Sequence, residues 1–492
     1  MKRSLIVVPL VVVVAAAAIL FLGGPTREFT TTSPEAYEAY QRGFGHIMAF
    51  QFALAESSLT RATSLDPAFA MARAQLAVVY HRDWRRKLAE EQKVIADSLS
   101  WLLPNEVEKA KIQLVLCGLK DQHTVRRDSI LDFLVAEDPD NLLVLTAHGS
   151  SLYQRDNVKA REIFEEILAI EPNNAPAYNM LGYMAAAEGD FETAQAHLRK
   201  YMFLAPDLAN PHDSLGQILS WMGEYEESER EYRTALNIEP DFYFSLLGLA
   251  NIYLEQGMLK KGGDIIAQLR PHISGTPVEK QIDQKMIQIL YTYELYEESY
   301  AGIASFIERY PDDNATPFYR AIHAGIEDRF DDADAIMAAF LEDSRMKAGM
   351  SGSAEYMRAV ESFPHQYAAI IASFQERHAD AADAWSRFRE AREQDIDYQE
   401  RWWELWRESE SRLAAGEPGM ALPLAMKALD PNPRRIRPLL VIARAALDLN
   451  QLEVARTAAD QLGPLMAKAD DNLPPQSTYR EVLARLQVVN TD

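Results

Sequence analysis

Apolar and polar positions repeat in the middle of the chain with a fixed period, marked by the equally spaced Pro172, Pro206 and Pro240. Within each unit the apolar residues recur three or four apart in two blocks, which predicts two amphipathic helices. Gly189 and Asp190 separate the two blocks and predict a turn. A single short helix cannot bury its apolar stripe alone. The pattern therefore predicts a stack of helical hairpins in which each hairpin covers the next.

Two sets of residues form the predicted faces of one hairpin. The first helix presents Tyr178, Leu181, Gly182 and Ala185, and the second presents Phe191, Ala194, Leu198, Tyr201 and Leu204. We expect the small Gly182 and Ala194 to let the two backbones approach closely, while the larger side chains fill the space between them.

These residues resemble the tetratricopeptide repeat, in which an aromatic-x2-Leu-Gly block is followed by Gly-Asp-aromatic-x2-Ala and then by proline. The next copy keeps Leu215, Gly216, Gly223, Tyr225, Tyr232, Ala235 and Pro240. The resemblance implies an all-α fold, a right-handed superhelical solenoid of antiparallel helix pairs.

Weaker copies of the pattern extend over most of the chain. We expect a first sub-array over residues 34–270 and a second, more degenerate one over 278–492, which ends in a capping helix. Ser33 and Pro34 predict the start of the first helix. Three further local features are predicted: a loop at Pro271, Gly275 and Pro277 between the sub-arrays, a flexible connection over Ser344–Ser353, and a capping box at Thr478 and Glu481 for a last helix to about Val489.

The start of the chain predicts a membrane anchor. Lys2 and Arg3 precede an uncharged run from Ser4 to Gly24, which is long enough to cross a bilayer. We expect residues 1–25 to form a single transmembrane helix, residues 26–33 a tether, and the solenoid to lie on the periplasmic side of the inner membrane. The alternative is a secretory signal peptide, whose removal leaves a periplasmic or secreted solenoid.

Composition narrows the chemistry. The net charge of −23 repels phosphate backbones and argues against nucleic acid. Cys117 is the only cysteine, which excludes an intrachain disulfide and a cysteine-ligated metal. The sequence lacks a helical His pair, a phosphate-binding loop, a dinucleotide fingerprint and a nucleophile elbow. We therefore expect no enzyme activity, no metal and no cofactor, and interpret acid pairs such as Glu226-Glu227 as solvated helix starts.

Two clusters leave alternatives open. Arg434, Arg435 and Arg437 form the only basic cluster, interpreted as solvent-facing arginines in an inter-repeat loop rather than an anion site. Among Trp402, Trp403 and Trp406, the first and third are interpreted as core residues. Trp403 is then the better candidate for an exposed aromatic shelf that could stack a sugar or peptide.

The resemblance also implies a ligand site, because the first helix of each hairpin lines the concave wall of the superhelix and binds extended or helical peptides. First-helix residues that do not face their partner helix are the candidates. They are Leu145, Tyr153, Asn179, Tyr183, Asp213, Gln217, Trp221, Phe244, Asn251 and Glu255. The clean copies place no Lys or Arg there, which argues against a carboxylate-clamp co-chaperone.

The sequence thus predicts a membrane-tethered scaffold that binds a protein or peptide in its concave groove and mediates complex assembly in the cell envelope. An accessory subunit of an envelope enzyme or secretion complex is the alternative. An enzyme in its own right and carbohydrate binding through Trp403 rank below both.

Overall fold

The computed structural model describes residues 28–83, 85–119, 124–153, 155–351, 354–392, 401–430 and 432–489. Within these ranges the secondary structure is helical throughout, without strands. The first half contains α2 (Pro34–Met48), α3 (Phe52–Leu65), α4 (Ala70–Arg82), α5 (Arg86–Ser100), α6 (Glu106–Cys117), α7 (Thr124–Glu137), α8 (Leu142–Leu152), α9 (Asn157–Ile170), α10 (Ala175–Ala187), α11 (Phe191–Leu204), α12 (Ala209–Trp221), α13 (Tyr225–Ile238), α14 (Tyr243–Glu255) and α15 (Leu259–Ile273). The second half contains α16 (Pro277–Thr292), α17 (Tyr296–Arg309), α18 (Thr316–Ile326), α19 (Phe330–Ser351), α20 (Ala354–Phe374), α21 (His378–Arg392), α22 (Arg401–Ala414), α23 (Pro418–Ala428), α24 (Ile436–Asp448), α25 (Leu452–Met466) and α26 (Pro474–Val489).

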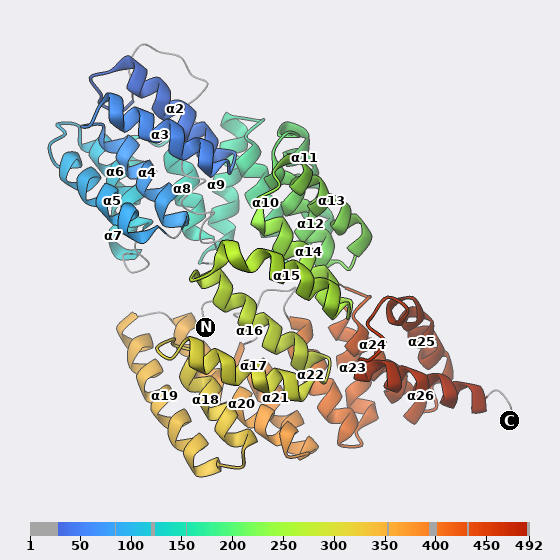
Figure 1. The fold of residues 1–492 in the computed structure, drawn as a ribbon. Coiled ribbons are helices and arrows are strands. Elements are labelled where there is room, and N and C mark those ends of the chain that lie inside the picture. Colours follow the sequence, from blue (N-terminus) through green and yellow to red (C-terminus); the bar gives the residue numbers. More distant parts are fainter. Residues whose placement is uncertain are drawn as a thin grey trace.

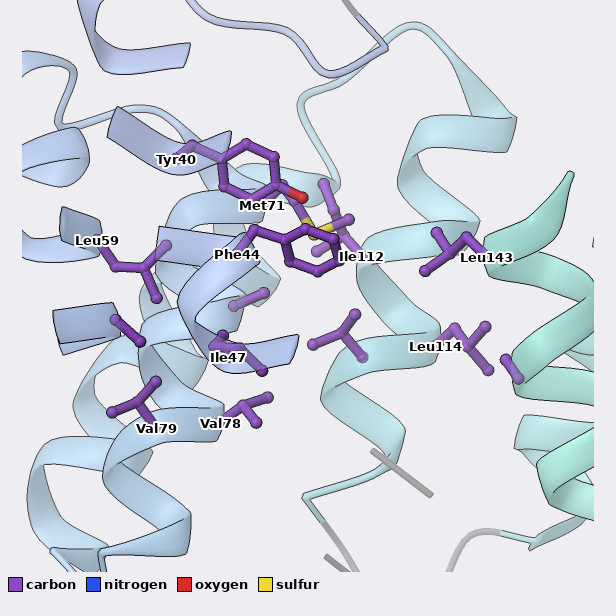
Figure 2. Packing of buried hydrophobic residues seen from close by; sticks show 14 of the residues in the cluster. Tyr40, Phe44, Ile47, Leu59, Met71, Val78, Val79, Ile112, Leu114 and Leu143 are labelled. Atoms are coloured by element: carbon purple, nitrogen blue, oxygen red, sulfur yellow. The ribbon is translucent and has the colours of Figure 1, made fainter. Parts of the chain in front are cut away.

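Consecutive helices pair as hairpins, from α2 with α3 to α24 with α25, and each hairpin packs on the next. The chain is therefore an α-helical repeat solenoid, as the sequence predicts. Its hydrophobic core runs along the stack instead of gathering at one centre. Figure 2 shows this for the first hairpins, where Phe44 and Ile47 of α2, Met71 of α4 and Ile112 of α6 belong to one buried cluster.

The period marked by the three prolines is confirmed in the helix starts. Helices α9, α11, α13 and α15 begin at residues 157, 191, 225 and 259, and α10, α12, α14 and α16 at 175, 209, 243 and 277. Local chemistry fixes these ends. The Asn174 and Asp190 side chains accept hydrogen bonds from main-chain N–H groups of the first turns of α10 and α11, and α9, α11 and α13 each end two residues before a proline.

The predicted faces of the repeat at 175–204 pack as expected. Leu181, Phe191 and Leu198 are buried, and Tyr178 is half-buried. A Cβ on Gly182 would lie 2.8 Å from Leu198 Cγ, so only glycine allows the two helices this approach.

Three local predictions are wrong. Pro271 lies inside α15, and the predicted loop shrinks to residues 274–276, because a proline near a helix end removes one hydrogen bond without stopping the helix at once. The predicted flexible connection after Ser344 is helical to Ser351, because Ser344 and Ala348 are buried and their packing outweighs weak helix propensity. Helix α26 begins at Pro474, so Thr478 and Glu481 lie within it and form no cap.

Helix α26 covers the last hairpin of the stack. Helix α26 packs against both α24 and α25, and it buries Val482 and Leu486 against them. A stack of hairpins needs such a cover, because its last apolar face would otherwise meet water.

The C-terminal hairpins also pack against hairpins from the middle of the chain, a contact that the sequence does not predict. Figure 1 shows the lower part curving back until α24 and α25 lie beside the helices near α14 and α15. One buried cluster contains residues of α14, α15 and α16 together with residues of α22 to α26, so apolar burial crosses the predicted boundary between the sub-arrays.

Polar contacts hold this return in place, and we name them the clasp. Its first half joins Arg434 and Lys468 to Glu226, with nitrogen–oxygen distances of 2.6 and 2.5 Å, and buries the hydrogen bond from Asn432 Nδ2 to the Tyr225 hydroxyl (2.9 Å). Its second half joins Asp470 to the α14–α15 turn: the Asp470 N–H donates to the Gly257 carbonyl, and its carboxylate accepts from the Lys260 N–H, both at 3.0 Å.

The predicted anchor at 1–25 lies outside the described residues. Among the helices that the structure describes, none is long and apolar enough to cross a membrane.

Candidate functional site

Side chains on the first helices of consecutive hairpins interact with one another along one wall. The Tyr183 hydroxyl of α10 donates to Gln217 Oε1 of α12 at 2.8 Å, and the Tyr183 and Trp221 rings meet edge to face with centroids 6.4 Å apart. One repeat further, Ser245 Oγ of α14 donates to Asp213 Oδ1 of α12 at 2.7 Å. Predicted wall residues of two consecutive repeats therefore contact one another, and the buried Ser245, which was not among the predicted residues, links Asp213 to the third repeat.

Burial changes the protonation chemistry of this wall. It raises the pKa of Asp213 to about 7, although the Ser245 hydrogen bond opposes that shift. Burial and the nearby Asp213 carboxylate also raise the pKa of Tyr183 above its usual range, so this phenol stays protonated and can donate. At neutral pH the Asp213 carboxyl is thus divided between its neutral and ionised forms.

The ten predicted peptide-binding residues do not all lie on open surface. Leu145 and Asn179 are 4% and 3% exposed, which leaves them almost no surface for a ligand, because they pack between neighbouring helices. The other eight are half-buried: Tyr153, Tyr183, Asp213, Gln217, Trp221, Phe244, Asn251 and Glu255.

Phe244 is already engaged by a distant part of the chain. The guanidinium of Arg82, at the end of α4, lies 3.9 Å from the centroid of Phe52 and 5.0 Å from that of Phe244. Phe52 belongs to the first hairpin and Phe244 to the seventh, so this cation–π contact joins two hairpins separated by five others. The repeat pattern of the sequence contains no signal for it.

A pocket lies where α14 and α16 meet α22 and α24. Its volume is about 30 Å³, and it opens to solvent. Its lining comes from two separate parts of the sequence, 225–293 and 402–437, which the clasp brings together. The walls carry Tyr225, Glu255, Lys285, Tyr293, Trp402, Trp403 and Arg435, among others. Of these, only Glu255 belongs to the predicted wall.

The structure corrects the interpretation of the basic cluster. Arg435 and Arg437 are 8% and 5% exposed, and Arg434 is paired with Glu226 in the clasp. Arg435 and Arg437 do not face solvent, and Arg434 is only half-buried. The acids that pair with Arg434 and Arg437 belong to distant helices or turns, which the local sequence cannot reveal. Glu226 is exposed in the first turn of α13, as interpreted from the sequence, and in addition it pairs with Arg434 and Lys468.

The tryptophans are also placed differently. Trp406 is fully buried and stacks on half-buried Trp402 at 6.1 Å, which agrees with their interpretation as packing residues. Trp403 is half-buried and meets Trp385 edge to face at 5.2 Å, so it is not the exposed shelf that the sequence suggested. Among the described residues no His, Cys, Asp and Glu cluster is arranged to hold a metal ion.

Comparison with known proteins identifies two repeats directly. Models of the tetratricopeptide repeat match residues 163–196 and residues 211–242. No curated protein matches the chain.

Solved structures that are similar include a mutant O-GlcNAc transferase of Thermobaculum terrenum, with 22% identity over 26% of this chain and a TM-score of 0.25; the chain spans a quarter (25%) of that protein. The tetratricopeptide domain of P58(IPK) is 12% identical, covering 93% of this chain and 99% of that one, with a TM-score of 0.25. PilF of Pseudomonas aeruginosa is 18% identical, covering 51% and 97%, with a TM-score of 0.26.

Proposed function

We propose that this tetratricopeptide-repeat chain is a non-enzymatic scaffold, tethered to a membrane in the cell envelope, that binds a protein or peptide partner on its concave wall. The observation that carries the proposal is the connected surface of Tyr183, Gln217 and Trp221, which presents aromatic faces and amide groups from consecutive repeats. Such a surface suits a peptide, because aromatic residues anchor apolar side chains and amides pair with a backbone.

Tethering is supported by the sequence alone, through the uncharged run from Ser4 to Gly24 behind Lys2 and Arg3. Of these residues the structure gives no account. An anchor would hold the solenoid near the bilayer and raise the local concentration of membrane partners.

The wall is tested by partner capture from solubilised membranes. The Tyr183→Ala/Trp221→Ala double variant should lose most of the proteins that the wild-type chain captures, because it removes two adjacent aromatic anchors. Phe203→Ala is the matched control, since this aromatic is 75% exposed on α11, away from the wall. An unchanged partner set in a double variant with wild-type circular dichroism would refute the wall assignment.

The tether is tested separately by cell fractionation. Deletion of residues 1–25 should move the protein from the carbonate-resistant membrane fraction to the soluble fraction, because it removes the apolar run. The intact mass of the mature protein distinguishes a retained anchor from a cleaved signal peptide, and a full-length protein that carbonate extracts would contradict tethering.

A further inference from the structure

The pocket between α14, α16, α22 and α24 combines hydrogen-bond donors that lack acceptors. The indole Nε1 of Trp403 is buried and has no hydrogen-bond partner among the described atoms. Lys285 of α16 forms no ion pair with any residue that the structure describes. A buried donor without an acceptor costs free energy, so a ligand that accepts from it gains affinity.

Arg435 adds a cation without a carboxylate partner in contact. Its guanidinium donates to the main-chain carbonyls of Ala428 and Asp430, at 3.0 and 3.3 Å, and lies 4.7 Å from the Trp402 centroid. Burial lowers the pKa of Arg435 to about 10, which still leaves it charged at neutral pH. The charge is therefore present and desolvated. The carboxylates of Glu255 and Asp430 act on it through space, without an ion pair in contact.

The neighbouring Arg437 does not supply a free cation. It is paired with Glu294 and Glu410, and Glu410 is also paired with Arg407 at 2.8 Å. This cluster holds two arginines and two carboxylates and is neutral as a whole.

With Arg437 neutralised, the charged residues that line the pocket are Lys285, Arg435 and Glu255. Their formal charges sum to one positive charge. The whole chain has a net charge of −23, so a positively charged pocket differs from the rest of the protein. Such a pocket attracts anionic ligands locally. A single excess charge favours a monoanion over a dianion. The volume of about 30 Å³ holds roughly two waters, which is about the space of the two oxygens of a carboxylate.

We propose that this pocket binds a carboxylate group next to an apolar or aromatic surface, with Lys285, Arg435 and the Trp403 indole as its donors. The source is either a free monocarboxylate or an acidic side chain of a peptide on the concave wall. Glu255 supports the second source, because it holds the place in its repeat that Trp221 holds in the preceding one, and so continues the wall into the pocket. The inference deepens the proposed function, on which its peptide source rests, by naming the chemistry that the partner must present.

The probes are benzoate, an end-blocked peptide with one glutamate among apolar residues, and the same peptide with glutamine instead. Tryptophan fluorescence of the full chain reports binding, because Trp402 and Trp403 line the pocket. Saturable binding of benzoate or of the glutamate peptide is expected, with the glutamine peptide at least about tenfold weaker, since a charge-assisted hydrogen bond is lost. Binding of benzoate alone identifies a free carboxylate as the source, and tighter binding of the glutamate peptide identifies a peptide.

Two variants test the donors. Lys285→Gln should weaken binding at least about tenfold, whereas Lys87→Gln, the same change on the exposed face of α5, should leave it unchanged. Trp403→Phe keeps the aromatic contact and removes the Nε1 donor, so it should weaken binding by a smaller factor. Wild-type affinity in Lys285→Gln, or no saturable binding of either acidic probe, would overturn the inference.

The proposed function is judged independently by the Tyr183→Ala/Trp221→Ala capture experiment. Lost capture together with no carboxylate binding refutes only the pocket. Carboxylate binding in a protein whose capture is insensitive to the double variant supports the pocket and refutes the wall.

Discussion

Gly223 and Gly416 show how one residue type serves two purposes in this fold. Both end the first helix of a hairpin in the left-handed region, with φ values of +78° and +79°. Around Gly416 a Cβ would meet open space, whereas at Gly223 it would lie 2.2 Å from Asn432 Oδ1 in the clasp. Gly416 is needed only for its backbone angle, and Gly223 also for a close approach.

The pair provides a matched test of the clasp. Gly416→Ala should lower the free energy of unfolding by about 1 kcal/mol, the cost of a left-handed alanine. Gly223→Ala should cost at least about 2–3 kcal/mol, because it also displaces Asn432. Urea unfolding followed by circular dichroism measures both, and equal losses would show that the clasp contributes nothing at this position.

Asp213 makes stability depend on pH. Its folded pKa of about 7 lies above the value of about 4 for an unfolded aspartate, so the folded state holds the proton more tightly. This contribution is complete below about pH 4 and is lost as the pH rises to about 7. The tyrosines near Asp213 include Tyr183, Tyr201 and Tyr232, and their raised pKa values keep them outside this window.

Asp213→Asn should remove that decline and keep the hydrogen bond from Ser245. At pH 8 the variant should be about 1–2 kcal/mol more stable than the wild type, a discounted value because Asp213 is only half-buried. Urea unfolding between pH 4 and 8 measures the two curves, with exposed Asp207→Asn as the control. Parallel curves for Asp213→Asn and the wild type would contradict the shift.

At the scale of elements, the local sequence predicts the helical hairpins correctly. Prediction from local sequence is wrong where tertiary packing determines the structure. The starts of α10 to α15 follow from the proline period and apolar spacing within a single repeat, with side-chain caps at α10 and α11. Helix α19 continues past Ser344 because tertiary burial stabilises a segment whose own residues favour a loop. The pocket and the Arg82 contact could not be predicted, since each joins hairpins far apart in sequence, and no residue within one repeat indicates its distant partner.

Arg82 should couple the first hairpins to α14. Arg82→Gln removes the cation–π contacts with Phe52 and Phe244, which are worth about 1–2 kcal/mol when desolvated. Hydrogen exchange should then rise in both the α2–α3 turn and the start of α14, although these two segments belong to hairpins that are not neighbours in sequence. Arg86→Gln, on the exposed side of α5, is the control, and a rise confined to one of the two segments would contradict coupling.

At the scale of the whole molecule, the clasp turns part of an open superhelix into a closed arc. The hairpins from α14 to α25 leave the first array and return to it (Figure 1). In an ordinary solenoid each repeat contacts only its neighbours in sequence, whereas this one also has contacts between distant repeats. The alternation of helices could be predicted, but this closure depends on surfaces that meet only after the stack has curved.

A zero-length carbodiimide cross-linker should detect the closure in solution. Lys468 Nζ and Glu226 Oε1 lie 2.5 Å apart, so an amide bond between them is expected in the monomer. The local pair Lys260 and Asp264, 2.9 Å apart on α15, should cross-link under the same conditions and controls for reactivity. The 468–226 product should vanish in Glu226→Gln, and its absence from the wild-type monomer, with the local product present, would show an open arc.

Closure has a consequence for how such a chain can change its length. An open stack accommodates one more or one fewer hairpin, because only the adjacent units must adapt. Between α16 and α21 the stack has to bridge a fixed span, from the end of α15 to the helix that returns beside it. Duplication or loss of a hairpin there would misplace Asn432 by a whole repeat, whereas the same event among α2 to α9 would leave the clasp in register.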